Sequence, residues 1–282
     1  MPTAPSRAAS TAARDRSRLD VALVARGLVE SREKAQALIV AGLVSVDGRP
    51  AQKSAEPIGP DAVLHVQTAD GFASRGGEKL EHALQTFGIQ TAGLVCLDAG
   101  ASTGGFTDVL LRRGAARVYA VDVGHGQLDW RLRGDSRVVV MERTNVRTLE
   151  SLPETMDLAV ADLSFISLRL VLPAIGRLTR PGAPIVTLVK PQFEAGKDQV
   201  PRGGVIRDPA VHRRVLLDLW SWALAHDLTP HDLTPSPIRG PAGNVEFLLS
   251  LTNRPAHSDE FDRLTASAEL LVGQVLANVP PR

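Results

Sequence analysis

The sequence predicts an α/β protein in which a small α/β domain precedes a Rossmann-like, mostly parallel sheet. From residue 94 onward, short apolar runs alternate with helix-like stretches, which is typical of a parallel sheet with helices on both faces. The strand candidates are residues 94–98, 117–122, 137–141, 157–162, 184–190 and 245–252. Residues 233–238 and 245–252 are joined by a turn-like segment rich in Gly and Pro, so the last strand is expected to be antiparallel.

The chain length of 282 residues suggests one large or two ordinary domains. Composition along the chain predicts four parts. They are a disordered tail over residues 1–16, a first domain over 17–69, a linker over 70–78 and a second domain over 79–282. The tail is rich in Ala, Ser, Thr and Arg and has no continuous apolar core, which argues against a signal peptide.

Bulk composition restricts the class of protein. The net charge is +1, so nucleic-acid binding has to come from a local patch. Cys96 is the single cysteine, which excludes an internal disulfide and predicts a reducing, cytoplasmic compartment. No apolar run reaches about 18 residues, so we expect no membrane span. The histidines lack metal-ligand spacing, and we expect no metal.

The first domain carries a local basic excess. Helical periodicity predicts one helix over Arg18–Val29 and another from the N-cap Ser31 to Gly42, and Asp47-Gly48 predicts a hairpin turn. Residues 1–53 contain nine Lys or Arg and five Asp or Glu. Such a cluster is able to follow a phosphate backbone, although a solvated surface is the simpler interpretation. The candidate RNA-binding residues are Arg18, Ser31, Arg32, Lys34, Arg49 and Lys53.

The segment Val95 to Phe106 predicts a strand, a tight glycine-rich turn and the start of a helix. Glycines allow the backbone to approach a ligand, and the N–H groups at a helix start bind an anionic group. The next strand ends at Asp122, where an acid is able to accept hydrogen bonds from ribose hydroxyls. The pattern therefore predicts a cofactor that carries a nucleoside.

The spacing of the glycines favours S-adenosylmethionine (SAM). The loop reads Gly-x-x-x-Gly-Gly, whereas NAD sites favour Gly-x-Gly-x-x-Gly, and no Gly-Lys-Ser/Thr follows for a P-loop. Asp98 is expected near the SAM ammonium, Asp122 at the ribose and Asn145 near the adenine, with an ordinary strand-end cap as the alternative for each. The candidate cofactor-binding residues are Asp98, Gly100, Ser102, Thr103, Gly104, Gly105, Phe106, Asp122, Asn145 and Asp162.

Four charged residues are candidates for chemistry. Asp162 and Lys190 close apolar runs at the sheet edge where ligands bind in open α/β folds. Glu246 lies in an apolar run and Lys79 on the helix before the sheet, although an outward-facing acid and a solvated lysine are simpler interpretations. Two lysines with two acids suggest activation of a hydroxyl. We expect Lys190 to act there as a base or as a positioning donor, with the acids holding the lysines and Lys79 tuning Lys190.

These motifs together resemble a known family. The first domain is similar to S4 RNA-binding domains, and the rest resembles FtsJ-like ribose methyltransferases. The joined arrangement resembles the TlyA family, whose members are sometimes labelled haemolysins. The matching segments are 18–20, 31–48, 74–80, 98–106, 161–166, 189–194 and 243–246.

The resemblance implies SAM-dependent methylation of a ribose 2′-OH in ribosomal RNA. It places the superfamily's Lys-Asp-Lys-Glu tetrad on Lys79, Asp162, Lys190 and Glu246. Two alternatives stay open, a membrane-active haemolysin-like protein and a non-catalytic RNA-binding protein. The first requires an amphipathic or membrane-spanning element, and the second requires a site that does not bind SAM.

Overall fold

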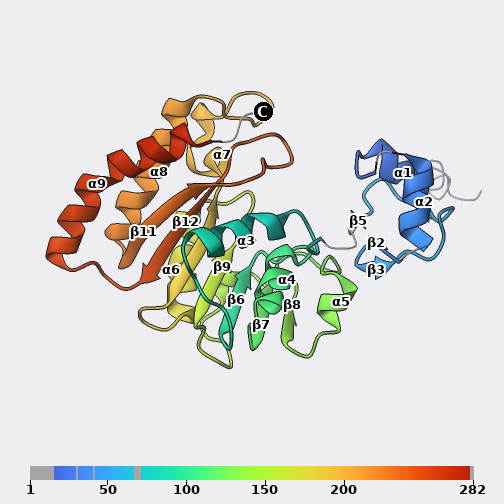
Figure 1. The fold of residues 1–282 in the computed structure, drawn as a ribbon, viewed down its shortest axis with the longest axis horizontal. Helices are drawn as coiled ribbons and strands as arrows, with labels where there is room; N and C mark the ends of the chain where they lie inside the picture. The colour runs from blue at the N-terminus through green and yellow to red at the C-terminus, as the bar shows by residue number, and fades with distance from the viewer. Residues whose placement is uncertain (1–15, 30, 41, 67–70, 280–282) are drawn as a thin grey trace, which may run out of the picture.

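The computed structural model describes residues 16–29, 31–40, 42–66 and 71–279. Two domains are visible, a small one near the N-terminus and a larger one built around a single sheet (Figure 1). The predicted disordered tail falls almost wholly on residues 1–15, which lie outside the described residues.

The N-terminal domain packs two helices against short strands. The helices are α1 (Leu19–Ala25) and α2 (Arg32–Val40), and the strands are β1 (Ser17–Arg18), β2 (Val44–Val46), β3 (Arg49–Pro50), β4 (Pro57–Ile58) and β5 (Leu64–Val66). Strand β2 pairs antiparallel with both β3 and β5. Helix α1 is shorter than predicted, because the chain turns at Gly27, whose φ of +66° does not continue a helix.

The predicted Asp47-Gly48 turn is confirmed. Both residues have positive φ, 49° and 74°, as the two central positions of a type I′ hairpin turn require. The Asp47 carboxylate also accepts a hydrogen bond of 2.8 Å from the Val63 N–H. That contact ties the turn to the chain just before β5.

The larger domain is a seven-stranded sheet in the order β11-β12-β10-β9-β6-β7-β8. Its strands are β6 (Val95–Ala99), β7 (Arg117–Val121), β8 (Val138–Met141), β9 (Leu158–Ala161), β10 (Pro184–Val189), β11 (Leu228–Pro235) and β12 (Phe247–Asn253). Strand β12 runs antiparallel to both of its neighbours, and the pairs among β6 to β10 are parallel. The predicted mostly parallel sheet with an antiparallel last strand is therefore confirmed.

The position of β11 differs from the prediction. It spans Leu228–Pro235 rather than 233–238, and it pairs along its length with β12, from Leu228 opposite Asn253 to Pro235 opposite Phe247. Hydrogen bonding to β12 decides this boundary, whereas the prediction relied on apolar residues alone. The connection between the two strands consequently runs from 236 to 246, and Glu246 lies directly before β12.

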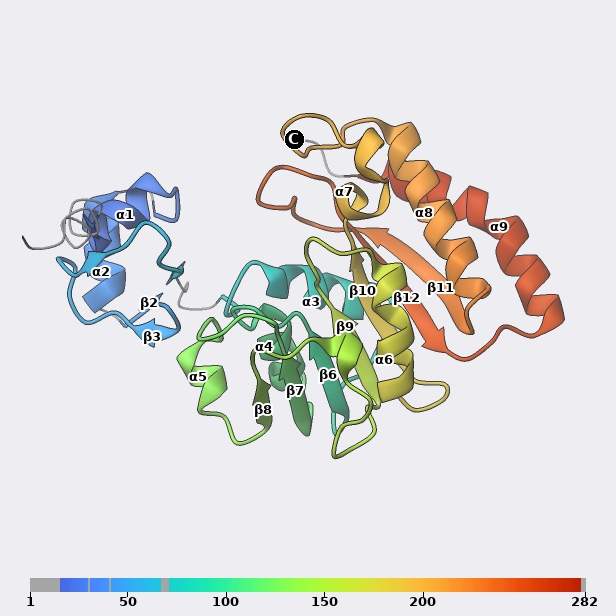
Figure 2. The same cartoon turned by 180° about the vertical axis from the view of Figure 1, so that it is seen from behind.

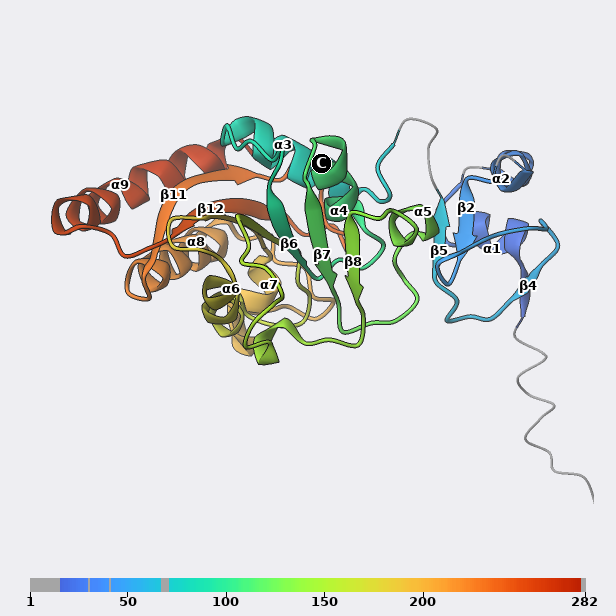
Figure 3. The same cartoon turned by 90° about the horizontal axis from the view of Figure 1, so that it is seen from below.

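Helices cover both faces of the sheet (Figures 2 and 3). One face packs against α3 (Gly76–Thr86) and α4 (Gly105–Arg112), and the other packs against α6 (Leu172–Leu178) and α8 (Pro209–Leu224), with α9 (Ser258–Ala277) against α8 and β11. The short elements are α5 (Trp130–Arg133), α7 (Pro191–Glu194) and the 3₁₀ turns η2 (Val146–Thr148), η3 (Leu168–Leu170) and η4 (Lys197–Gln199). Alternate residues of each central strand enter the two cores, as the pleat of a strand requires.

Within the described residues, no helix is long and apolar enough to cross a bilayer.

The segment predicted as a linker belongs partly to the larger domain. Helix α3 begins at Gly76, and Ala73 is fully buried, with its N–H donating to the Asp108 carboxylate at 2.7 Å. The Phe72 ring lies under the Arg112 guanidinium at 4.9 Å. Phe72 and Ala73 therefore pack against α4 as part of the larger domain, although composition alone assigned them to a linker.

The two domains touch at the Asp47-Gly48 turn. A Cβ added at Gly48 would lie 2.2 Å from the Gly126 carbonyl oxygen, so the turn fits against the loop after β7 only as glycine. Nearby, His65 Nε2 lies 4.0 Å from the Asp129 carboxylate. Burial lowers the pKa of His65, while Asp129 opposes that shift. Figure 3 shows this side of the molecule, with β5 next to α5.

We expect Gly48→Ala to loosen this contact. The methyl group has no room beside Gly126, so the turn has to withdraw from the loop, and the amides of residues 124–129 should exchange hydrogen faster. Gly27→Ala is the matched control, because Gly27 also has positive φ but no atom within 4 Å of the added Cβ. Hydrogen-exchange mass spectrometry of both variants makes the comparison. Equal exchange in the two variants would show that the contact does not hold the loop.

Candidate active site

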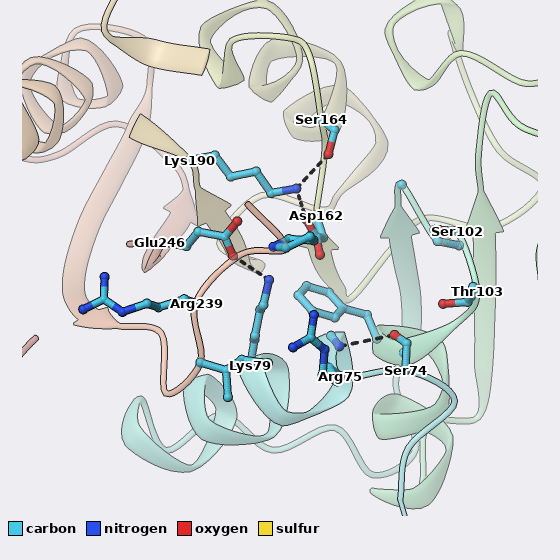
Figure 4. Close-up of a pocket in the computed structure, with 17 residues that line it drawn as sticks. Ser74, Arg75, Lys79, Ser102, Thr103, Asp162, Ser164, Lys190, Arg239 and Glu246 are labelled. Carbon is cyan, nitrogen blue, oxygen red and sulfur yellow. Dashed lines mark hydrogen bonds and ion pairs between the residues drawn. The ribbon is translucent and has the colours of Figure 1, made fainter. Parts of the chain in front are cut away.

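A two-lobed cleft lies at the carboxyl edge of the parallel strands. The first lobe, of about 300 Å³, is bordered by the glycine loop, α3 and the segment before β12. The second, of about 450 Å³, is bordered by the ends of β7 and β9 and by residues 144–147. Gly100, Ser102, Asp162 and Ser164 line both lobes, so the two form one site. Figure 4 shows the first lobe.

The glycine loop has the predicted strand–turn–helix organisation. It connects β6 to α4, and Gly100 and Gly104 have φ values of +88° and +95°. A Cβ at Gly100 would lie 2.5 Å from the Asp162 carbonyl oxygen, and one at Gly104 would lie 2.3 Å from a Leu132 methyl carbon. Thr103, Gly105 and Phe106 also line the first lobe, whereas Gly104 faces α5 instead. Close packing against Asp162 therefore accounts for Gly100, and close packing against α5 accounts for Gly104.

Asp122 and Asn145 both lie on the second lobe. The Asp122 carboxylate accepts hydrogen bonds from the Ser102 N–H at 2.8 Å and the Gly124 N–H at 2.6 Å. Asn145 is the N-cap of η2, with its side chain accepting from the Arg147 N–H at 3.1 Å. Asn145 is therefore both a cap and a pocket residue, and Asp122 is held in place with its carboxylate at the cleft.

Asp98 is not on the cleft surface. Its side chain is fully buried, it lines neither lobe, and its Oδ2 accepts a hydrogen bond of 2.6 Å from the Thr107 hydroxyl. Burial raises the pKa of Asp98 to about 7, and the Thr107 hydrogen bond opposes the shift. The position of Asp98 near the SAM ammonium stays a prediction, and the structure places its carboxylate beneath the glycine loop on the α4 side and not on the cleft surface.

Asp98 should make folding stability depend on pH. Its pKa is raised in the folded state, so the contribution of Asp98 to stability is largest below the unfolded value of 3.8 and falls as pH rises toward about 7, by about 1.4 kcal/mol per pH unit. Asp98→Asn removes the charge, and we expect it to flatten this slope and to raise stability at pH 8. Urea unfolding between pH 4.5 and pH 8 measures both, with the wild-type protein as reference. Parallel curves for the two proteins would contradict the prediction.

The four candidate chemical residues form two ion pairs in the first lobe (Figure 4). Lys79 Nζ lies 2.5 Å from Glu246 Oε2, and Lys190 Nζ lies 2.6 Å from Asp162 Oδ1. Lys190 also donates to the Ser164 hydroxyl at 2.9 Å. Lys79 and Glu246 are both buried, which excludes the simpler interpretations of a solvated lysine and an outward-facing acid. Tertiary structure has brought together residues from α3, from the positions directly after β9 and β10, and from the segment before β12.

Sequence reasoning missed several residues of the first lobe. Ser74, Arg75, Ser164 and Arg239 line it, and Arg75 and Arg239 add two cations to the two lysines and two acids (Figure 4). Ser164 and Ser74 lie inside recognisable motifs, which was a usable signal. Arg239 lies in the β11–β12 connection, and nothing in its local sequence marks it.

The predicted RNA-binding residues stay in the N-terminal domain and do not line the cleft. Arg18 and Arg32 contact the buried Asp20 at 2.9 and 3.1 Å, and the pKa of Asp20 is held well below its usual range, mainly by Arg18. Ser31 is the cap that accepts from the Lys34 N–H at 3.2 Å. The side chains of Lys34, Arg49 and Lys53 are exposed.

In the described part of the chain, no group of three or more His, Cys, Asp or Glu residues is placed to hold a metal ion.

The FtsJ-like methyltransferase family matches residues 72–253, and the S4 domain matches residues 17–64. The chain is 52% identical over 240 residues to the 16S/23S rRNA (cytidine-2′-O)-methyltransferase TlyA of Mycobacterium tuberculosis, covering 84% of this chain and 90% of that protein. It is 42% identical over 234 residues to Hemolysin A of Brachyspira hyodysenteriae, covering 82% and 98%. A solved structure, "Putative hemolysin from Streptococcus thermophilus", has a TM-score of 0.71 and 39% identity, covering 93% and 96%.

The fold and the cleft therefore define a methyltransferase domain that follows an S4 domain. The chain belongs to the FtsJ-like methyltransferase family, in its TlyA group. Its cofactor is SAM, and the residues present fit that molecule. Asp122 in the second lobe would accept hydrogen bonds from ribose hydroxyls, and the glycine loop and Ser74 in the first lobe would hold the polar methionine end.

Proposed function

We propose that this protein transfers a methyl group from SAM to a ribose 2′-OH of ribosomal RNA. The observation that carries the proposal is the placement of two lysine–acid pairs, Lys79–Glu246 and Lys190–Asp162, in the same lobe as the glycine loop. A lysine in the lobe bordered by the glycine loop would contact a hydroxyl that enters this lobe.

SAM supplies an electrophilic methyl group, and the protein has to orient the hydroxyl and handle its proton. Lys190 is placed for this step, because Asp162 and Ser164 hold its Nζ at the junction of the two lobes. As a neutral amine it takes the hydroxyl proton, and as an ammonium it orients the oxygen. Lys79 is fixed by Glu246 and adds a second positive charge to the lobe.

The RNA substrate is supported by the S4 domain and by the named activity of the Mycobacterium tuberculosis relative, a 16S/23S rRNA (cytidine-2′-O)-methyltransferase. On that basis we propose a cytidine as the target nucleotide and a cytoplasmic location beside ribosomes. The exposed Lys34, Arg49 and Lys53 contact phosphates and thereby dock structured RNA. DNA lacks the 2′-OH and should not serve as substrate.

The deciding experiment maps 2′-O-methyl groups on ribosomal RNA from cells with and without this protein, and repeats transfer in vitro with labelled SAM. A methyl group that appears only with the protein, on a ribose, supports the proposal. Methylation of a base, or SAM binding without any transfer to ribosomal subunits, would refute it. Release of dye from liposomes by the purified protein would instead favour the haemolysin-like alternative.

A further inference from the structure

The loop after Asp162 is held at both ends by the segment that carries Lys190. At its first end, Lys190 Nζ contacts Asp162 at 2.6 Å and Ser164 at 2.9 Å. At its second end, the Glu194 carboxylate accepts hydrogen bonds from the Ser167 hydroxyl and from the Leu168 N–H, both at 2.7 Å. Glu194 is the last residue of α7, the single helical turn that directly follows Lys190.

The middle of this loop is exposed and conformationally unfavourable. Phe165 is 90% exposed and has a φ of +64°, a left-handed conformation that is strained for a residue with a bulky side chain. Its one ring contact in the described structure is with Phe193, at 5.2 Å between centroids. A strained loop keeps such a conformation only when its surroundings hold it. Glu194 supplies two hydrogen bonds for that purpose.

The placement of Glu194 is itself costly. Burial raises the pKa of this carboxyl, and its two hydrogen bonds and the nearby Arg169 oppose the shift. Both hydrogen-bond donors to this partly buried acid come from the loop after Asp162. This arrangement indicates that Glu194 serves to hold that loop in place. The loop borders both lobes, since Asp162 and Ser164 line the first and residues 162–166 line the second.

We propose that Glu194 is a positioning residue for methyl transfer, which fixes the 162–168 loop so that Asp162 and Ser164 hold Lys190 at the reacting hydroxyl. The carboxylate contacts neither lobe and acts only through the loop. The inference rests on the proposed function, because it assigns Glu194 a task in the reaction that Lys190 serves.

Four variants test the assignment. Glu194→Ala removes both acceptors, and Glu194→Gln keeps an acceptor for the Leu168 N–H and an amide donor for the Ser167 hydroxyl. Ser167→Ala removes one of the two donors. Glu260→Ala is the matched control, because Glu260 also accepts from a side chain and a backbone N–H, at the start of α9 and outside the cleft.

At saturating SAM, Glu194→Ala should lower kcat on ribosomal RNA by about 10- to 100-fold, with a smaller change in the KM for RNA, because the reacting groups lose their alignment. Glu194→Gln should stay within about threefold of wild type, since a neutral hydrogen bond replaces a charged one. Glu260→Ala should keep wild-type kcat. A wild-type kcat in Glu194→Ala, or an equally low kcat in Glu194→Gln, would overturn the proposal.

Two further measurements separate the possible causes of failure. If Glu194→Ala does not fold, as judged by thermal melting, Ser167→Ala decides, and a wild-type kcat in that variant overturns the proposal. If the wild-type protein methylates no ribosomal RNA, the proposed function fails, whereas SAM affinity still tests the loop. Calorimetry should then show weaker SAM binding for Glu194→Ala than for Glu194→Gln, because the loop lines the second lobe. Equal affinities would count against the inference.

Discussion

Lys190→Ala is expected to lower kcat for methyl transfer by about 10²- to 10⁴-fold, which is the usual contribution of a positioned acid or base. Lys190 Nζ is the one group that contacts both Asp162 and Ser164 within the first lobe of the described structure. Its removal leaves the 2′-OH without a partner for its proton or its lone pairs. SAM affinity should stay close to wild type, because the glycine loop and Asp122 are unchanged.

Lys190→Arg distinguishes a base from a positioning donor. An arginine keeps the charge and the donors, but it cannot accept a proton at neutral pH. Partial activity in Lys190→Arg therefore indicates positioning, and loss equal to that of Lys190→Ala indicates a base. Arg180→Ala is the control, because Arg180 pairs with Asp157 at the opposite edge of the sheet. Wild-type turnover in Lys190→Ala would show that the tetrad assignment is wrong.

Glu246→Ala is expected to lower the free energy of unfolding by about 3–5 kcal/mol, because it leaves the Lys79 ammonium buried without its partner. The side chains of Lys79 and Glu246 are 7% and 2% exposed, and their charged atoms are 2.5 Å apart. Urea unfolding measures the loss. The Arg254–Glu260 pair supplies the control, since its side chains are more exposed, at 33% and 18%, and Glu260→Ala should therefore cost less than Glu246→Ala.

The double variant Lys79→Met/Glu246→Leu separates stability from chemistry. Replacing both partners by apolar side chains removes the buried charges together, so stability should recover toward that of wild type. Methyl transfer should remain impaired, because the first lobe has lost two charged groups. Recovery of activity along with stability would mean that this pair serves the fold alone. A loss in Glu246→Ala no larger than in Glu260→Ala would mean that the pair does not hold the fold.

Local sequence predicted most of the secondary structure that surrounds the site. The glycine loop between β6 and α4 and the Asp47-Gly48 turn were predicted because their conformations depend on residues adjacent in the chain. The predicted first residue of β11 is wrong by five positions, because hydrogen bonding to β12 decides where this strand begins. Sequence assigns residues 71–75 to a linker, because the burial of Ala73 and its hydrogen bond to Asp108 on α4 are contacts between distant segments.

For this protein, sequence alone determined the fold class, the cofactor loop and the identity of the four charged candidates. Those features follow from hydrophobic periodicity, from glycine spacing, from charged residues beside or within apolar runs and from the family motifs, which are all read from the chain itself. Tertiary structure alone decided that Lys79 pairs with Glu246 and Lys190 with Asp162, that Asp98 lies beneath the loop, and that Glu194 holds the loop after β9. These facts depend on distances between residues far apart in the chain, and only packing of the sheet and its helices sets such distances.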